Sequence, residues 1–316
     1  MSIPSSTIDQ PLHREQFLAT VVANVPLCRE HYRLVLRVDR FPATEPGQFV
    51  QVACRDIEMS DEVEHEWQPG QRIAVSDHDL LSPQAMLRRP FSLAGRRDTA
   101  GGAELELIHR VVGIGTDWLS KLSAGDKVDV LGPLGNRFTL PMEGETALLV
   151  GGGVGIPPML YLAAKFAKQP AVAFCGALSR DLLPLTITND AKFPIQEFAT
   201  HSLPTFVTTD DGSFGQRGYV TQALEKYLDV NQQPAIIYTC GPEPMMKAVA
   251  TIALNRNIPC QIAVERAMAC GMGTCQSCCI KVKKPDPAAP PLPGSDWCYR
   301  LACTDGPVFY ASQLLW

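Results

Sequence analysis

The first half of the chain alternates short apolar or β-branched runs with polar turns and shows no strong helical period. Such runs occur at residues 17–25, 32–38, 47–53, 72–75, 91–94, 105–112 and 127–131. Strand-length runs separated by turn signals are typical of an antiparallel β-barrel. We therefore predict a β-barrel domain over residues 16–143, with an elaborated loop in its polar stretch at 55–87.

The pattern changes at residue 146, where strand-like runs begin to alternate with helical ones. An apolar run at 146–150 leads through a glycine-rich turn into a helical stretch at 157–168, and a second apolar run follows at 171–177. The alternation continues at 205–209, 220–228, 235–240, 243–255 and 261–264. This order is typical of a parallel sheet with crossover helices. It predicts an α/β domain over residues 144–260.

The remaining segment, 261–316, is short and holds a cysteine-rich loop and a proline-rich stretch at 284–296. Because proline cannot join the interior of a sheet, we expect that stretch to be an exposed loop. The predicted fold class is thus a β plus α/β multidomain protein with a small C-terminal domain.

Composition narrows the function classes. The chain has 316 residues, of which 46% are hydrophobic and 19% charged, as in a globular protein. Its net charge is −5 and it has no basic run, which argues against a nucleic-acid partner. No apolar stretch reaches membrane-spanning length. Eleven cysteines without a signal sequence indicate a reducing compartment, so we expect a cytoplasmic protein.

Three cysteines near the C-terminus carry the clearest chemical signal. Cys270, Cys275 and Cys278 stand in the order C-x4-C-x2-C, the plant-type spacing that ligates a [2Fe–2S] cluster. Gly271 and Gly273 suit a tight loop around such a cluster because glycine tolerates positive φ and close approach. Structural zinc is the alternative, but zinc sites favour short C-x2-C pairs. The spacing therefore indicates one-electron redox chemistry.

The fourth ligand is open on spacing alone. Cys279 adjoins Cys278 and would point away if Cys278 points inward, whereas Cys298 and Cys303 both lie downstream.

The glycine-rich turn is the second chemical signal. It comprises Gly151, Gly152, Gly153 and Gly155 between a strand and a helix. Such a turn directs free N–H groups and the positive helix end toward an anion, as in nucleotide-binding folds. The pattern is not the full G-x-G-x-x-G fingerprint. A tight turn without a ligand is the alternative.

A second strand of the α/β domain ends at Cys240, Gly241 and Pro242. Ligands in open parallel sheets lie beyond such carboxyl ends, so the Cys240 thiol is a candidate to contact a nicotinamide ring in the catalytic step. A buried cysteine at the strand end is the alternative.

The predicted barrel holds two further candidates. An arginine before a strand could bind a diphosphate, and a serine two positions past the following proline could reach a flavin nitrogen, although an ordinary edge strand is the alternative. These residues are Arg89, Pro90, Phe91 and Ser92. Farther along, Gly115 and Thr116 would open a helix suited to phosphate. His109 on the preceding strand has no assigned proton-transfer role.

The order of these motifs resembles the ferredoxin–NAD(P)⁺ reductase superfamily over nearly the whole chain. The motifs are PGQFV at 46–50, RPFS at 89–92, VGIGT at 112–116, GGGVG at 151–155 and CGP at 240–242. The tail, ERAMACGMGTCQSCC and ACTDGPVF, is similar to the electron-transfer subunits of class 1B dihydroorotate dehydrogenases, as is TTDDGSFGQRGYV at 208–220. The resemblance covers all three predicted domains.

The resemblance implies three cofactor sites. FAD would be held by Arg89, Pro90, Phe91, Ser92, Ile108, His109, Arg110, Gly115 and Thr116. NAD, with NADP possible, would be bound by Gly151, Gly152, Gly153, Gly155, Cys240, Gly241 and Pro242. The cluster would take Cys303 as its fourth ligand beside Cys270, Cys275 and Cys278. The chain departs from the family in having His109 where tyrosine is common, and in its longer gap between Cys278 and Cys303.

The implied function is electron relay between NAD and a catalytic partner in pyrimidine biosynthesis, within a hetero-oligomer. Electrons would pass from dihydroorotate through the partner's flavin to this cluster, FAD and NAD⁺. Two alternatives remain: a reductase subunit of another complex, such as a hydrogenase or an NADH-dependent ferredoxin:NADP⁺ oxidoreductase, or a non-catalytic binding protein. Ser179 and Arg180 follow the second α/β strand, where an arginine could meet a 2′-phosphate or simply be solvated.

Overall fold

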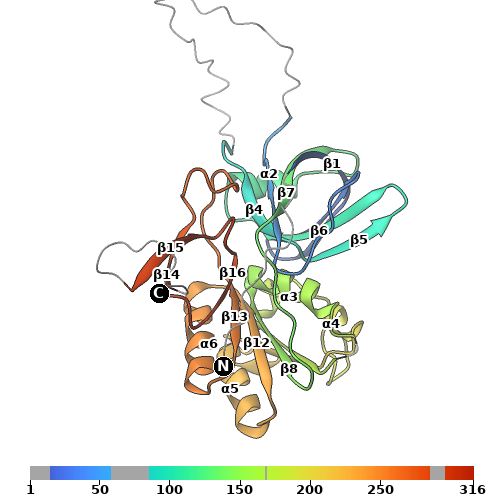
Figure 1. The fold of residues 1–316 in the computed structure, drawn as a ribbon. Helices are drawn as coiled ribbons and strands as arrows, with labels where there is room; N and C mark the ends of the chain where they lie inside the picture. Colours follow the sequence, from blue (N-terminus) through green and yellow to red (C-terminus); the bar gives the residue numbers. More distant parts are fainter. Residues whose placement is uncertain (1–14, 58–84, 168, 285–295) are drawn as a thin grey trace, which may run out of the picture.

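The computed structural model describes residues 15–57, 85–167, 169–284 and 296–316. Two large sheets lie one above the other, and the C-terminal segment lies along the side of both (Figure 1). The strand expected at 72–75 is outside the described residues, as are most of the 55–87 loop and of the proline-rich stretch. No helix in the four described ranges is long and apolar enough to cross a membrane.

The first sheet has seven strands in the order β4-β3-β7-β1-β2-β6-β5, all antiparallel, and curls into a half-barrel. Its elements are β1 (Glu15–Cys28), β2 (His31–Val38), β3 (Phe49–Val52), β4 (Arg89–Ser92), β5 (Gly95–Thr99), β6 (Gly102–Arg110), α2 (Ile114–Ser120) and β7 (Lys127–Leu134). The predicted antiparallel architecture is confirmed. The sequence did not predict β5, because its GRRDT sequence gives an edge strand no apolar alternation.

The second sheet has the order β11-β10-β9-β8-β12-β13-β16 and is parallel from β11 to β13. Its elements are β8 (Thr146–Gly152), η1 (Gly153–Gly155), α3 (Ile156–Ala163), β9 (Ala171–Ala177), η2 (Arg180–Leu182), α4 (Gln196–Ala199), β10 (Thr205–Thr209), β11 (Gln216–Arg217), α5 (Val220–Val230), β12 (Ala235–Cys240), α6 (Glu243–Asn255) and β13 (Cys260–Ala263). The predicted α/β region is confirmed, with α3 shorter than the 157–168 expected. The chain order reverses between β8 and β12, which makes their carboxyl ends the topological switch point.

The C-terminal segment is attached to the α/β sheet. Strands β14 (Cys279–Lys283) and β15 (Trp297–Leu301) form a two-stranded antiparallel sheet, and β16 (Val308–Tyr310) pairs antiparallel with β13. One hydrophobic core contains Cys278, Cys303 and Phe309 together with Leu148 of β8. The cysteine loop is therefore fixed to the α/β sheet, and the division at residue 260 stays a prediction.

Candidate functional site

The glycine-rich turn and the Cys240–Pro242 turn meet at the switch point. A Cβ atom added to Gly155 would lie 2.2 Å from the carbonyl carbon and oxygen of Cys240, so only glycine permits this backbone contact. Gly241 has φ +153° and would place a Cβ 3.0 Å from Gly152 O. The structure thus brings together two motifs that lie about 85 residues apart in the sequence.

Gly153 differs from its neighbours in the same turn. Its φ is +52° and no atom lies within 4 Å of an added Cβ, so its backbone faces open space at the strand ends. Cys240, whose carbonyl group meets Gly155 of the same turn, ends β12 and is 9% exposed. Burial raises the pKa of Cys240 to about 12, so its thiol is neutral at physiological pH. The site therefore offers a free backbone surface and an uncharged thiol.

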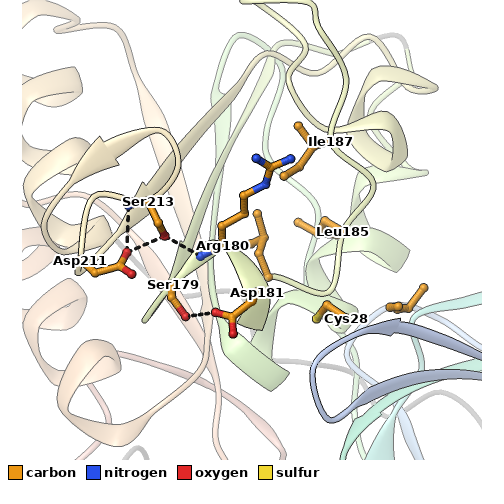
Figure 2. Close-up of a pocket in the computed structure, with 10 residues that line it drawn as sticks. Cys28, Ser179, Arg180, Asp181, Leu185, Ile187, Asp211 and Ser213 are labelled. Atoms are coloured by element: carbon orange, nitrogen blue, oxygen red, sulfur yellow. Dashed lines mark hydrogen bonds between the residues drawn. The ribbon is translucent and has the colours of Figure 1, made fainter.

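A cavity of about 610 Å³ extends this edge of the sheet (Figure 2). Ser179 and Arg180 follow β9, Asp211 and Ser213 follow β10, and Cys28 ends β1, so both sheets contribute to its wall. Ser213 Oγ donates to Asp211 Oδ1 at 2.6 Å and accepts from Arg180 N at 2.8 Å. The hydrogen bond from Ser213 lowers the pKa of Asp211, which is therefore ionised at neutral pH.

Sequence reasoning did not assign Asp211 or Ser213 to a site. The sequence indicated them only by their position, because both come shortly after the strand-like run that forms β10. Arg180, which the sequence offered as a phosphate partner, has its guanidinium carbon 5.8 Å from the centre of the Phe214 ring.

The residues expected to hold a flavin gather at the edge of the half-barrel. The Phe91 ring of β4 meets the His109 ring of β6 edge-on, with centroids 6.1 Å apart. The Tyr32 ring of β2 stacks on the His109 ring with centroids 5.7 Å apart. Both ring nitrogens of His109 are buried without a hydrogen-bond partner in the described residues. Burial lowers the pKa of His109 to about 4, so the ring is neutral.

The three arginines near this edge differ in whether they form ion pairs. Arg110 pairs with Glu30 at 2.8 Å, and Arg88 pairs with Asp129. Arg89 donates to Leu87 O at 2.9 Å and forms no ion pair within the described ranges. Arg89 is thus the cation on β4 that remains available to an anion.

The helix expected at Gly115 and Thr116 is present as α2, which begins at Ile114. Thr116 Oγ1 accepts from Val112 N at 2.9 Å and from Gly113 N at 3.2 Å, so its hydroxyl caps its own helix. Gly115 is buried, and an added Cβ would lie 3.1 Å from Cys54 Cβ and 3.3 Å from Ala85 Cβ. Gly115 therefore allows close packing beneath the turn, and the exposed backbone at Gly113 faces outward.

The cysteine loop arranges its thiols in two pairs. Cys270 Sγ accepts from Cys275 N and from Met272 N, each at 3.4 Å. Cys278 and Cys303 are each 1% exposed. Burial, then contact with Cys278, raises the pKa of Cys303 to about 12. The outer pair is thus Cys270 with Cys275, and the inner pair is Cys278 with Cys303.

This arrangement suits a binuclear cluster, in which each iron takes two thiolates. Gly271 and Gly273, at φ +70° and +89°, allow the loop to turn. The other two candidates lie on the hairpin: Cys279 faces Leu301, and Cys298 faces Val282 farther along the ladder.

Comparison with known proteins supports a cluster site in the C-terminal segment and a nucleotide site in the α/β sheet. Residues 265–315 match the family model for the iron–sulfur cluster binding domain of dihydroorotate dehydrogenase B, and residues 149–251 match the oxidoreductase NAD-binding domain. The electron transfer subunit of dihydroorotate dehydrogenase B (NAD(+)) from Caldanaerobacter subterraneus subsp. tengcongensis is 34% identical over 302 residues, covering 96% of this chain and 99% of that protein. The chain belongs to this family of electron transfer subunits. It is therefore an oxidoreductase subunit.

Two further matches extend the comparison. The electron transfer subunit from Bacillus caldolyticus is 39% identical over 251 residues, covering 78% of this chain and 87% of that protein. Among solved structures, a chain of NADH-dependent reduced ferredoxin–NADP oxidoreductase superposes with a TM-score of 0.69 at 26% identity, covering 94% of this chain and 90% of that chain. The family and the fold expected from the sequence are thus both confirmed.

Proposed function

We propose that this electron transfer subunit relays electrons between the catalytic subunit of dihydroorotate dehydrogenase B and NAD, through a [2Fe–2S] cluster and FAD. FAD, when bound, exchanges electrons with nicotinamide in pairs and with a cluster one at a time, while the cluster carries single electrons. The chain's own residues position these groups and exclude water from between them. We keep the division into FAD, nucleotide and cluster regions at 16–143, 144–260 and 261–316.

The cluster would be held by the two thiol pairs, Cys270 with Cys275 and Cys278 with Cys303. The donor set supports the binuclear type, because four thiols in two pairs match two irons. Burial of the inner pair keeps water from half of the site. Cys303 is favoured over Cys298 because its thiol contacts Cys278 inside the core.

The flavin would lie along the open edge of β4, near Arg89, Pro90, Phe91 and Ser92. An edge strand offers unpaired backbone donors and acceptors to a ligand. The unpartnered nitrogens of His109 support a polar ligand beside this strand, since buried polar groups normally have a partner. Ile108, Arg110 and the Gly115–Thr116 turn would complete the cradle, with Arg89 free to face the diphosphate.

Nicotinamide would lie at the switch point, against Gly153 and the neutral thiol of Cys240. The rest of the dinucleotide would extend toward the cavity beside Ser179 and Asp211. A carboxylate there accepts hydrogen bonds from ribose hydroxyls and repels a 2′-phosphate, which supports NAD over NADP.

The observation that carries the proposal is the continuity of the three regions. Ala94, just after β4, and Ile108 of β6 pack in the same core as Cys240 of β12. A second contact joins the half-barrel to the cysteine loop: Gln51 of β3 is paired with Pro90 of β4 and lies against Gly271. Electrons could therefore cross from nucleotide to flavin to cluster without leaving packed protein.

The deciding experiment combines composition with partner-dependent activity. Anaerobically purified protein should contain FAD, and iron and acid-labile sulfide in equal amounts. After mixing with a dihydroorotate dehydrogenase B catalytic subunit, dihydroorotate should reduce NAD⁺, and neither subunit alone should do so. Protein that lacks sulfide and flavin after anaerobic preparation would contradict the proposal.

A second candidate function is supported by the structural match to the NADH-dependent reduced ferredoxin–NADP oxidoreductase chain, which covers 94% of this chain. In that case the partner would be another redox subunit. The same experiment separates the two functions. If the second function holds, the protein will contain flavin and cluster, but dihydroorotate will reduce no NAD⁺ in the mixture.

A further inference from the structure

One buried side chain in the half-barrel has no hydrogen-bond partner among the described residues and has so far been named only as a packing contact. Gln51 of β3 is 0% exposed. Neither Oε1 nor Nε2 has a hydrogen-bond partner in the described residues. A primary amide has two donors and an acceptor, and leaving such groups buried without a partner is unfavourable. The position therefore calls for a ligand atom that the polypeptide itself does not supply.

Gln51 points away from the half-barrel core. Its neighbours Val50 and Val52 are core residues of the half-barrel, and alternate strand residues face opposite sides. Across the strands, Gln51 is paired with Pro90 of β4 and with Leu131 of β7. Its amide thus emerges on the face that meets the C-terminal segment.

The contact on that face is the cysteine loop. A Cβ added to Gly271 would lie 2.6 Å from Gln51 Oε1, so the backbone of the loop passes directly against the amide. Gly271 directly follows Cys270, whose sulfur already accepts two backbone N–H groups at 3.4 Å. The two ends of a glutamine amide exchange by a half-turn, so either end can face the loop.

We propose that Gln51 is a positioning residue, and that its side-chain amide N–H donates to a cluster sulfur on the Cys270 side. This hydrogen bond sets the reduction potential of the cluster relative to the flavin. The inference rests on the proposed function, because it requires the cluster. A hydrogen bond to a cluster sulfur stabilises the added negative charge of the reduced state and raises the potential. Gln51 also lies beside the flavin strand, so this donor stands between the two redox groups.

The test measures the cluster's midpoint potential by redox titration followed by electron paramagnetic resonance, on the full chain in complex with its catalytic subunit. Gln51→Leu keeps the shape and removes the donors, so the potential should become more negative than in the wild type. Gln51→Glu adds a negative charge at the same place and should lower it further. Thr208→Val removes another buried and unpartnered polar group, in β10, and should leave the potential unchanged.

A second measurement is made on the wild-type protein, with the Gln51 side chain in place. With glutamine labelled by ¹⁵N in the side-chain amide, pulsed resonance on the reduced wild-type cluster should detect a nitrogen coupling. The coupling should persist in Gln276→Asn, which removes the one glutamine within the cysteine loop, and vanish in Gln51→Glu. An unchanged potential in Gln51→Leu, or a coupling absent from the wild type, overturns the inference. Wild-type protein without iron and sulfide would instead contradict the proposed function.

Discussion

Asn136 and Val308 hold each other by two reciprocal hydrogen bonds. Asn136 Nδ2 donates to Val308 O, and Val308 N donates to Asn136 Oδ1, both at 2.9 Å. Asn136 comes just after β7, and Val308 begins β16. Asn136 N also donates to Gly306 O at 2.6 Å. The half-barrel is thereby fastened to the turn that follows Cys303.

Replacing this asparagine should loosen the cysteine segment. In Asn136→Ala, Val308 N and O lose their side-chain partners, and a buried unsatisfied group costs about 1–3 kcal/mol. We expect the free energy of unfolding, measured in urea, to fall by that amount, and the visible absorbance of the cluster to decay faster in air. The exposed neighbour gives the control, because Arg137→Ala should change neither quantity. An equal effect of both substitutions would contradict a stabilising role for the Asn136–Val308 hydrogen bonds.

The choice of the fourth ligand can be tested with two matched serines. Cys303→Ser removes a buried sulfur in contact with Cys278, so iron and acid-labile sulfide should be largely lost. Cys298→Ser changes a half-buried residue on β15 and should keep both at the wild-type level. Iron and sulfide assays on anaerobic preparations measure the difference. Retention in the first variant with loss in the second would reverse the assignment.

Local patterns in the sequence were enough for part of this picture. The run at 146–150 is buried throughout, so its apolar character predicted a central strand. The cysteine spacing likewise predicted a cluster loop, because three of the candidate cysteines are close together in the chain. In contrast, β5 is polar and lies at the edge of its sheet, so its pairing with β6 determines a strand that its sequence does not indicate.

Contacts between distant segments could not be predicted in this way. The approach of Gln51 to Gly271 depends on how the two sheets and the tail pack, and a single glutamine in an apolar run carries no sign of its neighbour. The same holds for Asn136 with Val308. Asp211 and Ser213 show an intermediate case, because their position after a parallel strand was visible while the cavity they line was not.

His109 predicts a specific pH dependence of stability. Burial lowers the pKa of His109 in the folded chain from 6.5 to about 4. Between these values the unfolded chain binds more protons, so stability is full above pH 6.5 and is lost as the pH falls toward 4, by up to about 3 kcal/mol at ~1.4 kcal/mol per pKa unit. Urea unfolding of flavin-free protein at neutral and acidic pH should show a smaller loss in His109→Phe. His31, whose pKa is also lowered, remains in both proteins.

Asp211 should help to select the nucleotide. In Asp211→Asn the carboxylate that faces the cavity is neutral, so repulsion of a 2′-phosphate is weakened. We expect the ratio of kcat/KM for NADPH to that for NADH, measured by flavin reduction, to rise several-fold. Asp190 also accepts from loop N–H groups but lines no part of this cavity, so Asp190→Asn should leave the ratio unchanged. A ratio that does not move in Asp211→Asn would place the adenosine end elsewhere.

Gly153 and Gly155 lie in one turn but should respond differently to alanine. In Gly155→Ala the new Cβ would lie 2.2 Å from the Cys240 carbonyl, so the two turns must separate and the melting temperature should fall sharply. In Gly153→Ala the Cβ meets no atom within 4 Å, and the cost is that of a positive φ alone, roughly 1 kcal/mol. Gly144→Ala has the same kind of cost, at φ +87° in open space away from the site. If Gly153 receives the nucleotide, Gly153→Ala should match Gly144→Ala in melting temperature yet raise KM for NADH; equal KM values in the two variants would remove Gly153 from the nucleotide site.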